Sequence, residues 1–160
     1  MGIPKAPAPQ KTTVLHGSAV LLKSVNFTPS VVFLRGRSGS GKSDLAFRLI
    51  ENGGELICDD QVSFEKRQDK IYAGAVEAIS GLIEVRGIGL LRYPVADPAR
   101  LRLVIDLVKH EEVPRLPDPQ VVNILGVDIP LLKLHAFDVS TVLKIYKAMD
   151  VVHKPGLVVK

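Results

Sequence analysis

The sequence has a single cysteine, Cys58, no tryptophan, and aromatic residues at only 5% of its 160 positions. A single cysteine excludes an internal disulfide, and with it the disulfide-stapled scaffolds of small secreted proteins. Scarce aromatics, with no interleaving of basic and aromatic side chains, argue against a nucleic-acid-binding surface. We therefore expect no nucleic-acid partner. Cys58 itself is interpreted as a small core residue of its apolar strand.

Long apolar runs are also missing. No run approaches the ~18 residues that a membrane helix requires. The N-terminal stretch MGIPKAPAPQKTT lacks the apolar core of a signal peptide. Together these absences predict no membrane association and a cytoplasmic location.

Acidic residues are scarce in the first third of the chain. Residues 1–50 contain seven lysines and arginines but one acidic residue, Asp44, whereas the remaining positions carry 14 lysines and arginines with 16 acidic residues. The net charge of +4 is therefore concentrated near the N-terminal segment. The positive electrostatic potential of this segment favours an anionic ligand near it.

The length and the 46% hydrophobic content suit one compact domain. We predict a disordered tail over 1–12, a single domain over 13–152 and a C-terminal tail over 153–160. Strands are expected to outnumber helices, which predicts an α/β domain with a mixed sheet. The expected strands are 13–22 (broken at Gly17), 31–36, 55–60, a 62–74 hairpin, parts of 79–94, 100–108, and two short strands around a turn at Gly126 within 121–134. The expected helices are 43–52 and 138–152, and 23–30 is expected to be a turn.

A glycine-rich stretch, GRSGSGKSDLAF, follows the apolar strand 31–36 and opens the first predicted helix. It fits the pattern G-x-x-x-x-G-K-[ST], in which backbone N–H groups and the helix N-terminus surround phosphate oxygens. Lys42 can reach the terminal phosphates, and the Ser43 hydroxyl can ligate Mg²⁺. The pattern predicts binding of a nucleoside triphosphate. The predicted nucleotide-binding residues are Gly36, Arg37, Ser38, Gly39, Ser40, Gly41, Lys42 and Ser43.

Two aspartates, Asp59 and Asp60, form the end of the second apolar strand, only a short distance after Lys42. Neighbouring residues of a strand point to opposite faces, so one carboxylate can face the phosphates while the other faces away. A carboxylate there can hold Mg²⁺ or its waters, or accept a proton from an attacking hydroxyl. The pattern alone leaves open which aspartate takes which role, and a solvated strand end remains the alternative.

Three further side chains are candidates for chemistry. Glu84 and Arg86 alternate with apolar residues in LIEVRGIG, so both can project from one face. They can form a plain ion pair, or serve as a metal ligand and a clamp on a transferring phosphoryl group. His16 precedes Gly17 at the end of a short strand; most lone histidines have no catalytic role.

These segments resemble the catalytic domain of the HPr kinase/phosphorylase family. The resemblance lies in LHG (15–17), GRSGSGKSD (36–44), ELICDDQV (55–62) and ISGLIEVRGIGLL (79–91), in that order, and extends over residues 13–150. It implies an α/β P-loop nucleotide-binding domain with a mixed β-sheet, of the HPr kinase and PEP carboxykinase-like type. Members of this family use ATP to phosphorylate a serine of HPr, a small phosphocarrier protein of a bacterial phosphotransferase system, and many reverse the reaction by phosphorolysis.

The resemblance also implies roles for particular residues. Lys42 would bind the phosphates, Asp60 would be the base that deprotonates the substrate serine, and Asp59 would support the site. Ser43, Glu84 and Asp59 would be the Mg²⁺ residues, and His16 would lie near the phosphate. Arg86 falls in the signature segment and counts with Asp60, Lys42 and His16 as a predicted catalytic residue. An HPr-like partner and a homo-oligomer are further implications.

The sequence departs from the family in three places. Members of usual length carry a separate N-terminal domain, whereas 1–12 alone precede the catalytic part here. The later G-R-N motif of the family should fall near 138–142, where this chain has DVSTV and no arginine. The C-terminal helices of the family are absent or shortened, which puts the reverse reaction in doubt. A nucleotide sensor without phosphoryl transfer and a small-molecule kinase therefore remain alternatives. The polar loop 109–120 is the predicted contact with the carrier protein.

Overall fold

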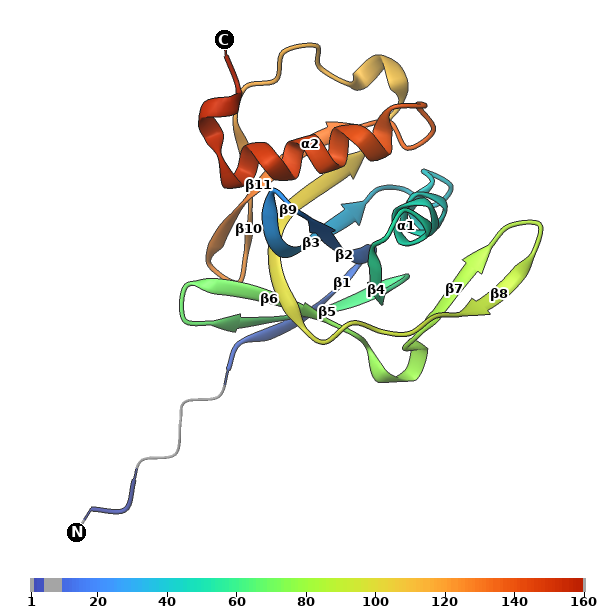
Figure 1. Cartoon of the computed structure of the whole chain (residues 1–160). Coiled ribbons are helices and arrows are strands. Elements are labelled where there is room, and N and C mark those ends of the chain that lie inside the picture. Colours follow the sequence, from blue (N-terminus) through green and yellow to red (C-terminus); the bar gives the residue numbers. More distant parts are fainter. Residues whose placement is uncertain (1, 5–9, 160) are drawn as a thin grey trace.

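The computed structural model describes residues 2–4 and 10–159, and its elements are labelled in Figure 1. The strands are β1 (Thr12–His16), β2 (Ser18–Ser24), β3 (Phe27–Arg35), β4 (Glu55–Cys58), β5 (Gln61–Arg67), β6 (Lys70–Gly74), β7 (Leu82–Val85), β8 (Gly89–Arg92), β9 (Ala99–Leu107), β10 (Gln120–Ile124) and β11 (Val127–Leu134). The α-helices are α1 (Lys42–Glu51) and α2 (Thr141–His153), and short 3₁₀ turns lie at Glu77–Ile79, His110–Glu112 and Pro155–Leu157.

Most predicted elements are present with nearly the expected bounds, including the break at Gly17, the hairpin turn after Arg67 and both helices. The predicted turn over 23–30 is wrong, because the chain turns at Val25 and Asn26 and β3 already begins at Phe27. Pro29 lies inside β3 where the β2–β3 register shifts, the kind of irregularity at which a strand accommodates proline. Of the predicted tail 1–12, residues 1 and 5–9 lie outside the described residues.

The sheet is mixed and strongly curled. Its main path runs β1-β5-β6-β9-β3-β2-β4, and β11, which carries β10, also pairs with β9. The neighbours β3, β9 and β11 are parallel, while the other pairs along this sheet are antiparallel. β9 can have three partners because β6 pairs with its first residues and β11 with its last. The expectation of an α/β domain with a mixed sheet is confirmed.

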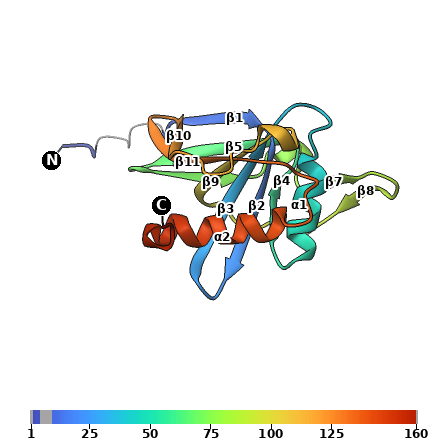
Figure 2. The ribbon, with the colours of Figure 1, turned by 90° about the horizontal axis from the view of Figure 1, so that it is seen from above.

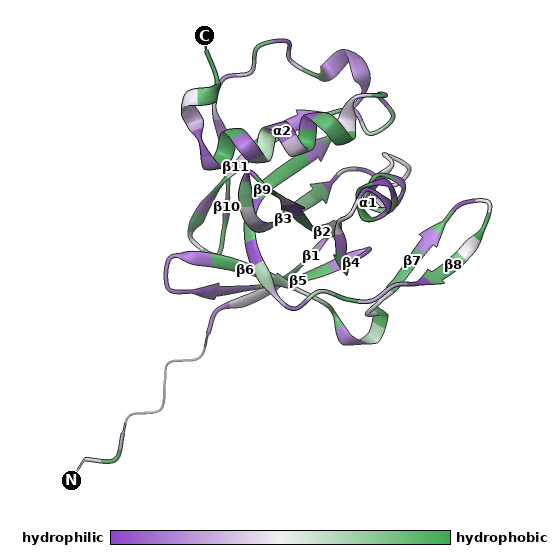
Figure 3. Cartoon of the chain, in the orientation of Figure 1, coloured by the Kyte–Doolittle hydropathy of each residue, from purple (hydrophilic) through white to green (hydrophobic). Residues whose placement is uncertain are grey.

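The central strands bury both of their faces. Alternate residues such as Val32 and Leu34 face α1 and α2, whereas Val31 and Phe33 face the β5–β6 side. Figure 2 shows the two helices against one side of the sheet. In Figure 3, β9 is largely green, while α2 alternates between green and purple as a half-buried helix does. The helices thus cover one face, and the curled sheet closes over the other.

Two features of this architecture position the candidate site. The parallel strands β3, β9 and β11 end at one edge of the sheet, and the loop 36–41 leaves β3 at that edge. The hairpin β7–β8 extends from the body beside α1 (Figure 1). Its inward side chain Ile83 is buried in the core beside α1, and the Tyr93 hydroxyl donates a hydrogen bond of 2.6 Å to Glu51.

Candidate active site

The glycine loop is built so closely that side chains would not fit at two of its glycines. A Cβ at Gly36 would lie 2.5 Å from Ser40 Oγ and 3.0 Å from the Leu107 carbonyl oxygen. A Cβ at Gly41 would lie 2.7 Å from Ala136 Cβ, and Gly41 has φ 95°, a left-handed conformation that favours glycine. The loop therefore folds tightly against the ends of β9 and β11.

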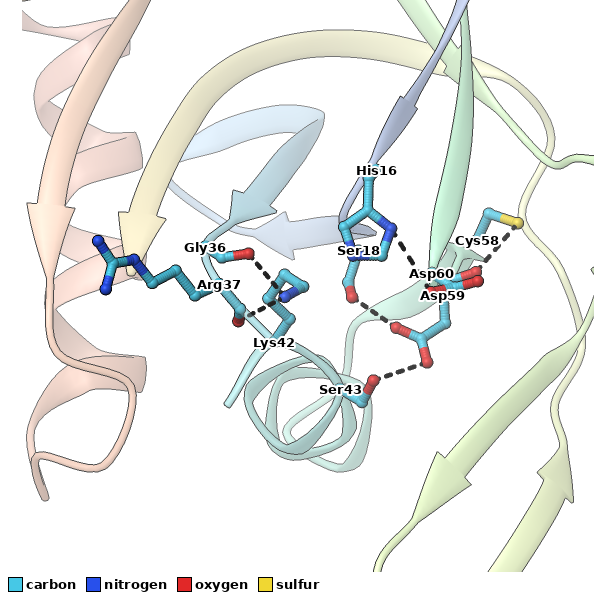
Figure 4. A network of polar contacts seen from close by, with 9 residues as sticks. All are labelled: His16, Ser18, Gly36, Arg37, Lys42, Ser43, Cys58, Asp59 and Asp60. Carbon is cyan, nitrogen blue, oxygen red and sulfur yellow. Dashed lines mark hydrogen bonds and ion pairs between the residues drawn. The ribbon is translucent and has the colours of Figure 1, made fainter. Parts of the chain in front are cut away.

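Lys42 is the first residue of α1, and its ammonium group turns back over the loop. Nζ donates hydrogen bonds to the Gly36 carbonyl at 2.8 Å and to the Arg37 carbonyl at 2.9 Å (Figure 4). An ammonium has three donors, so one is left for an anion. The helix N-terminus adds positive potential and free N–H groups at the same point. The arrangement suits a phosphate chain.

Asp59 is buried and held by two hydroxyl groups. Its Oδ1 accepts a hydrogen bond from Ser18 on β2, and its Oδ2 accepts one of 2.8 Å from Ser43 on α1 (Figure 4). A carboxylate beside the Ser43 hydroxyl offers the oxygen ligands that Mg²⁺ prefers. The described residues contain no group of three His, Cys, Asp or Glu side chains that could hold a metal. A metal ion beside Ser43 and Asp59 would therefore need ligands beyond these two side chains, such as phosphate oxygens. Glu84, the third residue expected to bind Mg²⁺, lines the pocket with Ser43, whereas Asp59 lies beneath that pocket's lining.

Asp60 faces solvent, and its backbone is unusual. β4 ends at Cys58, so the expectation that both aspartates belong to the strand 55–60 is wrong. Asp60 has φ 71°, a left-handed conformation that aspartate adopts more readily than most residues. Its carbonyl accepts a hydrogen bond of 3.0 Å from the Gly17 N–H, and its carboxylate lies 3.5 Å from His16 Nδ1. This turn presents the Asp60 carboxylate beside the exposed His16 (Figure 4).

An open pocket of about 380 Å³ collects most of the predicted residues. It is lined by the glycine loop with Lys42 and Ser43, by His16 and Asp60, and by Glu84 and Arg86 from the β7–β8 hairpin. The buried Ile83 and Val85 alternate with the exposed Glu84 and Arg86, so the hairpin turns both charged side chains outward as its pattern indicates. With Phe137, five separate segments of the chain thus meet around one cavity.

Sequence reasoning missed two residues of this region. Ser18 is fully buried and bonded to Asp59, and the signal for it was a serine inside an otherwise apolar strand. Phe137 also lines the pocket and is 57% exposed, and nothing in its local sequence indicated this. Cys58 is fully buried, which agrees with its interpretation as a core residue, and this burial raises the pKa of its thiol.

Known proteins resemble the chain in sequence and in structure. The model of the HPr Serine kinase C-terminal domain family matches residues 10–149. An HPr kinase/phosphorylase of Chloroherpeton thalassium is 32% identical over 131 residues, covering 74% of this chain and 37% of the relative. An HPr kinase/phosphorylase of Verminephrobacter eiseniae is 39% identical over 116 residues, covering 64% of this chain and 36% of the relative. The chain thus spans well under half the length of these curated relatives.

The fold has a solved counterpart. The structure of the HPr(Ser) kinase/phosphatase from Coxiella burnetii matches with a TM-score of 0.74 and 22% sequence identity, covering 91% of this chain and 92% of that one. No helix in the described part of the chain has the length and apolarity that crossing a bilayer needs. On the family model and the sequence relatives, the chain belongs to the HPr serine kinase C-terminal domain family.

Proposed function

We propose that the chain is an ATP-dependent protein serine kinase that phosphorylates an HPr-like phosphocarrier protein of a phosphotransferase system. The observation that carries this proposal is the convergence of Asp60, Glu84 and Arg86 on the glycine loop in one pocket. Membership of the family supports the substrate class. We further expect a cytoplasmic homo-oligomer.

The chemistry assigned to each side chain follows from its position. The loop N–H groups and Lys42 hold the phosphates, with Lys42 giving up the loop carbonyls for phosphate oxygens. Asp60 accepts the proton of the substrate serine hydroxyl. The serine oxygen bonds to the γ-phosphorus of ATP, and the bond from that phosphorus to the oxygen of the β-phosphate breaks. His16 orients Asp60, and Arg86 neutralises charge on the phosphoryl group. Mg²⁺, when bound, supplies further charge neutralisation between the phosphates.

Phosphoryl transfer is tested by mixing the protein with Mg²⁺, γ-labelled ATP and HPr-like carriers. Label on a carrier serine is expected with the native protein and is expected to be lost with Asp60→Asn. Asp69→Asn is the matched control, because Asp69 is an exposed residue of the β5–β6 turn that lines neither pocket. Equal labelling by the Asp60→Asn and native proteins would exclude Asp60 as the base.

A nucleotide sensor is the second candidate function. It is favoured by the missing arginine over 138–142 and by the hydrogen bonds that hold Lys42 on its own loop. A sensor should tolerate Asp60→Asn in its signalling and fail with Lys42→Ala, whereas a kinase should fail with both. A small-molecule kinase would turn over ATP with a metabolite hydroxyl and leave every carrier unlabelled. The missing arginine also keeps phosphorolysis outside the proposal.

The loop 109–120 is proposed to contact the carrier protein. Its first residues, Lys109 and Glu112, lie beside the glycine loop, and Leu116 near its centre is 93% exposed. Deletion of 111–118 and the single change Leu116→Asp are both expected to raise the KM for the carrier. ATP binding is expected to be kept in Leu116→Asp, because Leu116 lines neither pocket. Unchanged carrier phosphorylation in both variants would exclude this contact.

A further inference from the structure

A second pocket lies on the other side of the glycine loop. It has a volume of about 560 Å³ and sits over the ends of three parallel strands, β3, β9 and β11. In open sheets with parallel strands, ligands bind outside the carboxyl ends of the strands. Its walls are the loop 36–40, the end of β9 with Lys109, and His135 and Phe137 after β11. Apart from the loop itself, none of these walls has a role in the transfer step proposed above.

Phe137 joins the two pockets. It lines both of them and is 57% exposed, in a chain with only eight aromatic residues. Its ring meets the His135 ring edge-on, with centroids 5.8 Å apart and an angle of 71° between the planes. An exposed aromatic ring at the mouth of a pocket offers a flat surface on which a heterocyclic base can stack.

His135 is fixed in one orientation. Its Nδ1 donates a hydrogen bond of 2.9 Å to the Val108 carbonyl oxygen, since a carbonyl can only accept. In the neutral ring Nε2 is then an acceptor, and it has no hydrogen-bond partner among residues 2–4 and 10–159. The free Nε2 acceptor of His135, a residue that lines the pocket, suits a hydrogen bond from an amino group of a nucleotide base. Arg37 and Lys109 add positive charge to the same walls, against one acidic side chain, Glu112.

We infer that the second pocket binds the nucleoside part of the phosphate donor, with the base stacked on Phe137 and the phosphates in the first pocket. The inference rests on the proposed function, because it requires the glycine loop to bind a nucleoside triphosphate. It assigns the pocket to a nucleoside whose base carries an amino group, because the aromatic rings, the free acceptor and the cationic rim occur together on the far side of the glycine loop from the first pocket.

Calorimetric titration with ATP and with inorganic tripolyphosphate tests the inference, because tripolyphosphate has the phosphates and no base. The native protein is expected to bind ATP more tightly than tripolyphosphate. Phe137→Leu, which keeps apolar bulk against Gly41, is expected to weaken ATP binding at least about fivefold and to leave tripolyphosphate binding within about twofold. Phe137→Tyr keeps a ring and should bind both as the native protein does.

Three results would overturn the inference. Equal affinity of the native protein for ATP and tripolyphosphate would show that the base makes no contact. An equal loss of both ligands in Phe137→Leu would assign Phe137 to the packing of the loop. Native ATP affinity in Phe137→Leu would exclude stacking on this ring. In each case label transfer to a carrier would leave the proposed kinase standing, whereas a native protein that binds neither ligand would overturn both.

Discussion

Ser18 shows how one residue can set the geometry of a site from beneath it. Its buried hydroxyl holds one oxygen of Asp59 while Ser43 holds the other. Removing one donor from a buried carboxylate leaves it partly unsatisfied, at a cost of about 1–3 kcal/mol. Ser18→Ala is therefore expected to lower the free energy of unfolding by that amount and to reduce phosphoryl transfer, as measured by urea denaturation and by label transfer.

Ser63→Ala is the control for this change. Ser63 lies on β5, and its hydroxyl has no partner among the described residues. A free energy of unfolding for Ser18→Ala within about 0.5 kcal/mol of that of Ser63→Ala would contradict a supporting role for Ser18.

Cys58 should make the free energy of unfolding depend on pH in the alkaline range. Burial raises the pKa of its thiol above the ordinary 9.0, so above that pH the unfolded chain releases a proton that the folded chain keeps. The folded state then binds more protons, and the free energy of unfolding falls as the pH rises beyond about 9. We expect the fall to be steeper in the native protein than in Cys58→Ala, measured by urea denaturation at several pH values. Parallel curves would refute this linkage.

The β7–β8 hairpin brings a charged pair to the pocket as a unit. Ile83 anchors it in the core, and this leaves Glu84 and Arg86 at the cavity. Arg86→Ala should lower label transfer about 100-fold, the range found when one stabilising donor is lost, without lowering the urea midpoint. Arg92→Ala removes the same charge from the opposite strand of the hairpin and should leave transfer unchanged. Similar losses in the two variants would mean that the whole hairpin matters and Arg86 does not.

The tight packing of the glycine loop can be tested by comparing Gly41, in the loop, with Gly53, after α1, because the two have similar backbone conformations. Gly41 and Gly53 have φ of 95° and 100°, but a Cβ at Gly53 meets open space while one at Gly41 meets Ala136. Each alanine costs about 1–2 kcal/mol through its backbone. Gly41→Ala should in addition abolish ATP binding, measured by calorimetry, whereas Gly53→Ala should bind ATP normally. Normal ATP binding by Gly41→Ala would contradict the tight loop described above.

The whole domain depends on the curl of the sheet. Phe33 of the central strands meets Phe64 of β5 edge-to-face, with ring centroids 4.8 Å apart, and both side chains are fully buried. β5 begins directly after Asp60, so this contact also supports the site. Phe64→Ala should lower the free energy of unfolding by about 3–5 kcal/mol in urea denaturation, and Phe64→Leu by much less. Equally small losses of the free energy of unfolding in Phe64→Ala and Phe64→Leu would mean that β5 and β6 do not unfold cooperatively with the rest of the domain.

Local patterns were enough for most of the elements and for the glycine loop. Strands such as β9 and the hairpin β5–β6 follow from short-range alternation and turn residues, and α1 follows from its apolar spacing. The end of β4 was not predicted, because Asp60 leaves the strand through a left-handed conformation fixed by the Gly17 N–H, a residue far away in the chain. Pro29 was misread for a related reason, since a register shift against β2 accommodates it.

By itself the sequence determined the family, the strand and helix types, and the glycine loop between β3 and α1, because each is encoded in neighbouring residues. Only the tertiary structure decided which aspartate is buried, which is exposed, and that Ser18 and Phe137 belong to the region of the site. The physical reason is that burial and side-chain partners depend on strand order. The path β9-β3-β2-β4 and the parallel ends of β3, β9 and β11 bring together residues that no local pattern connects.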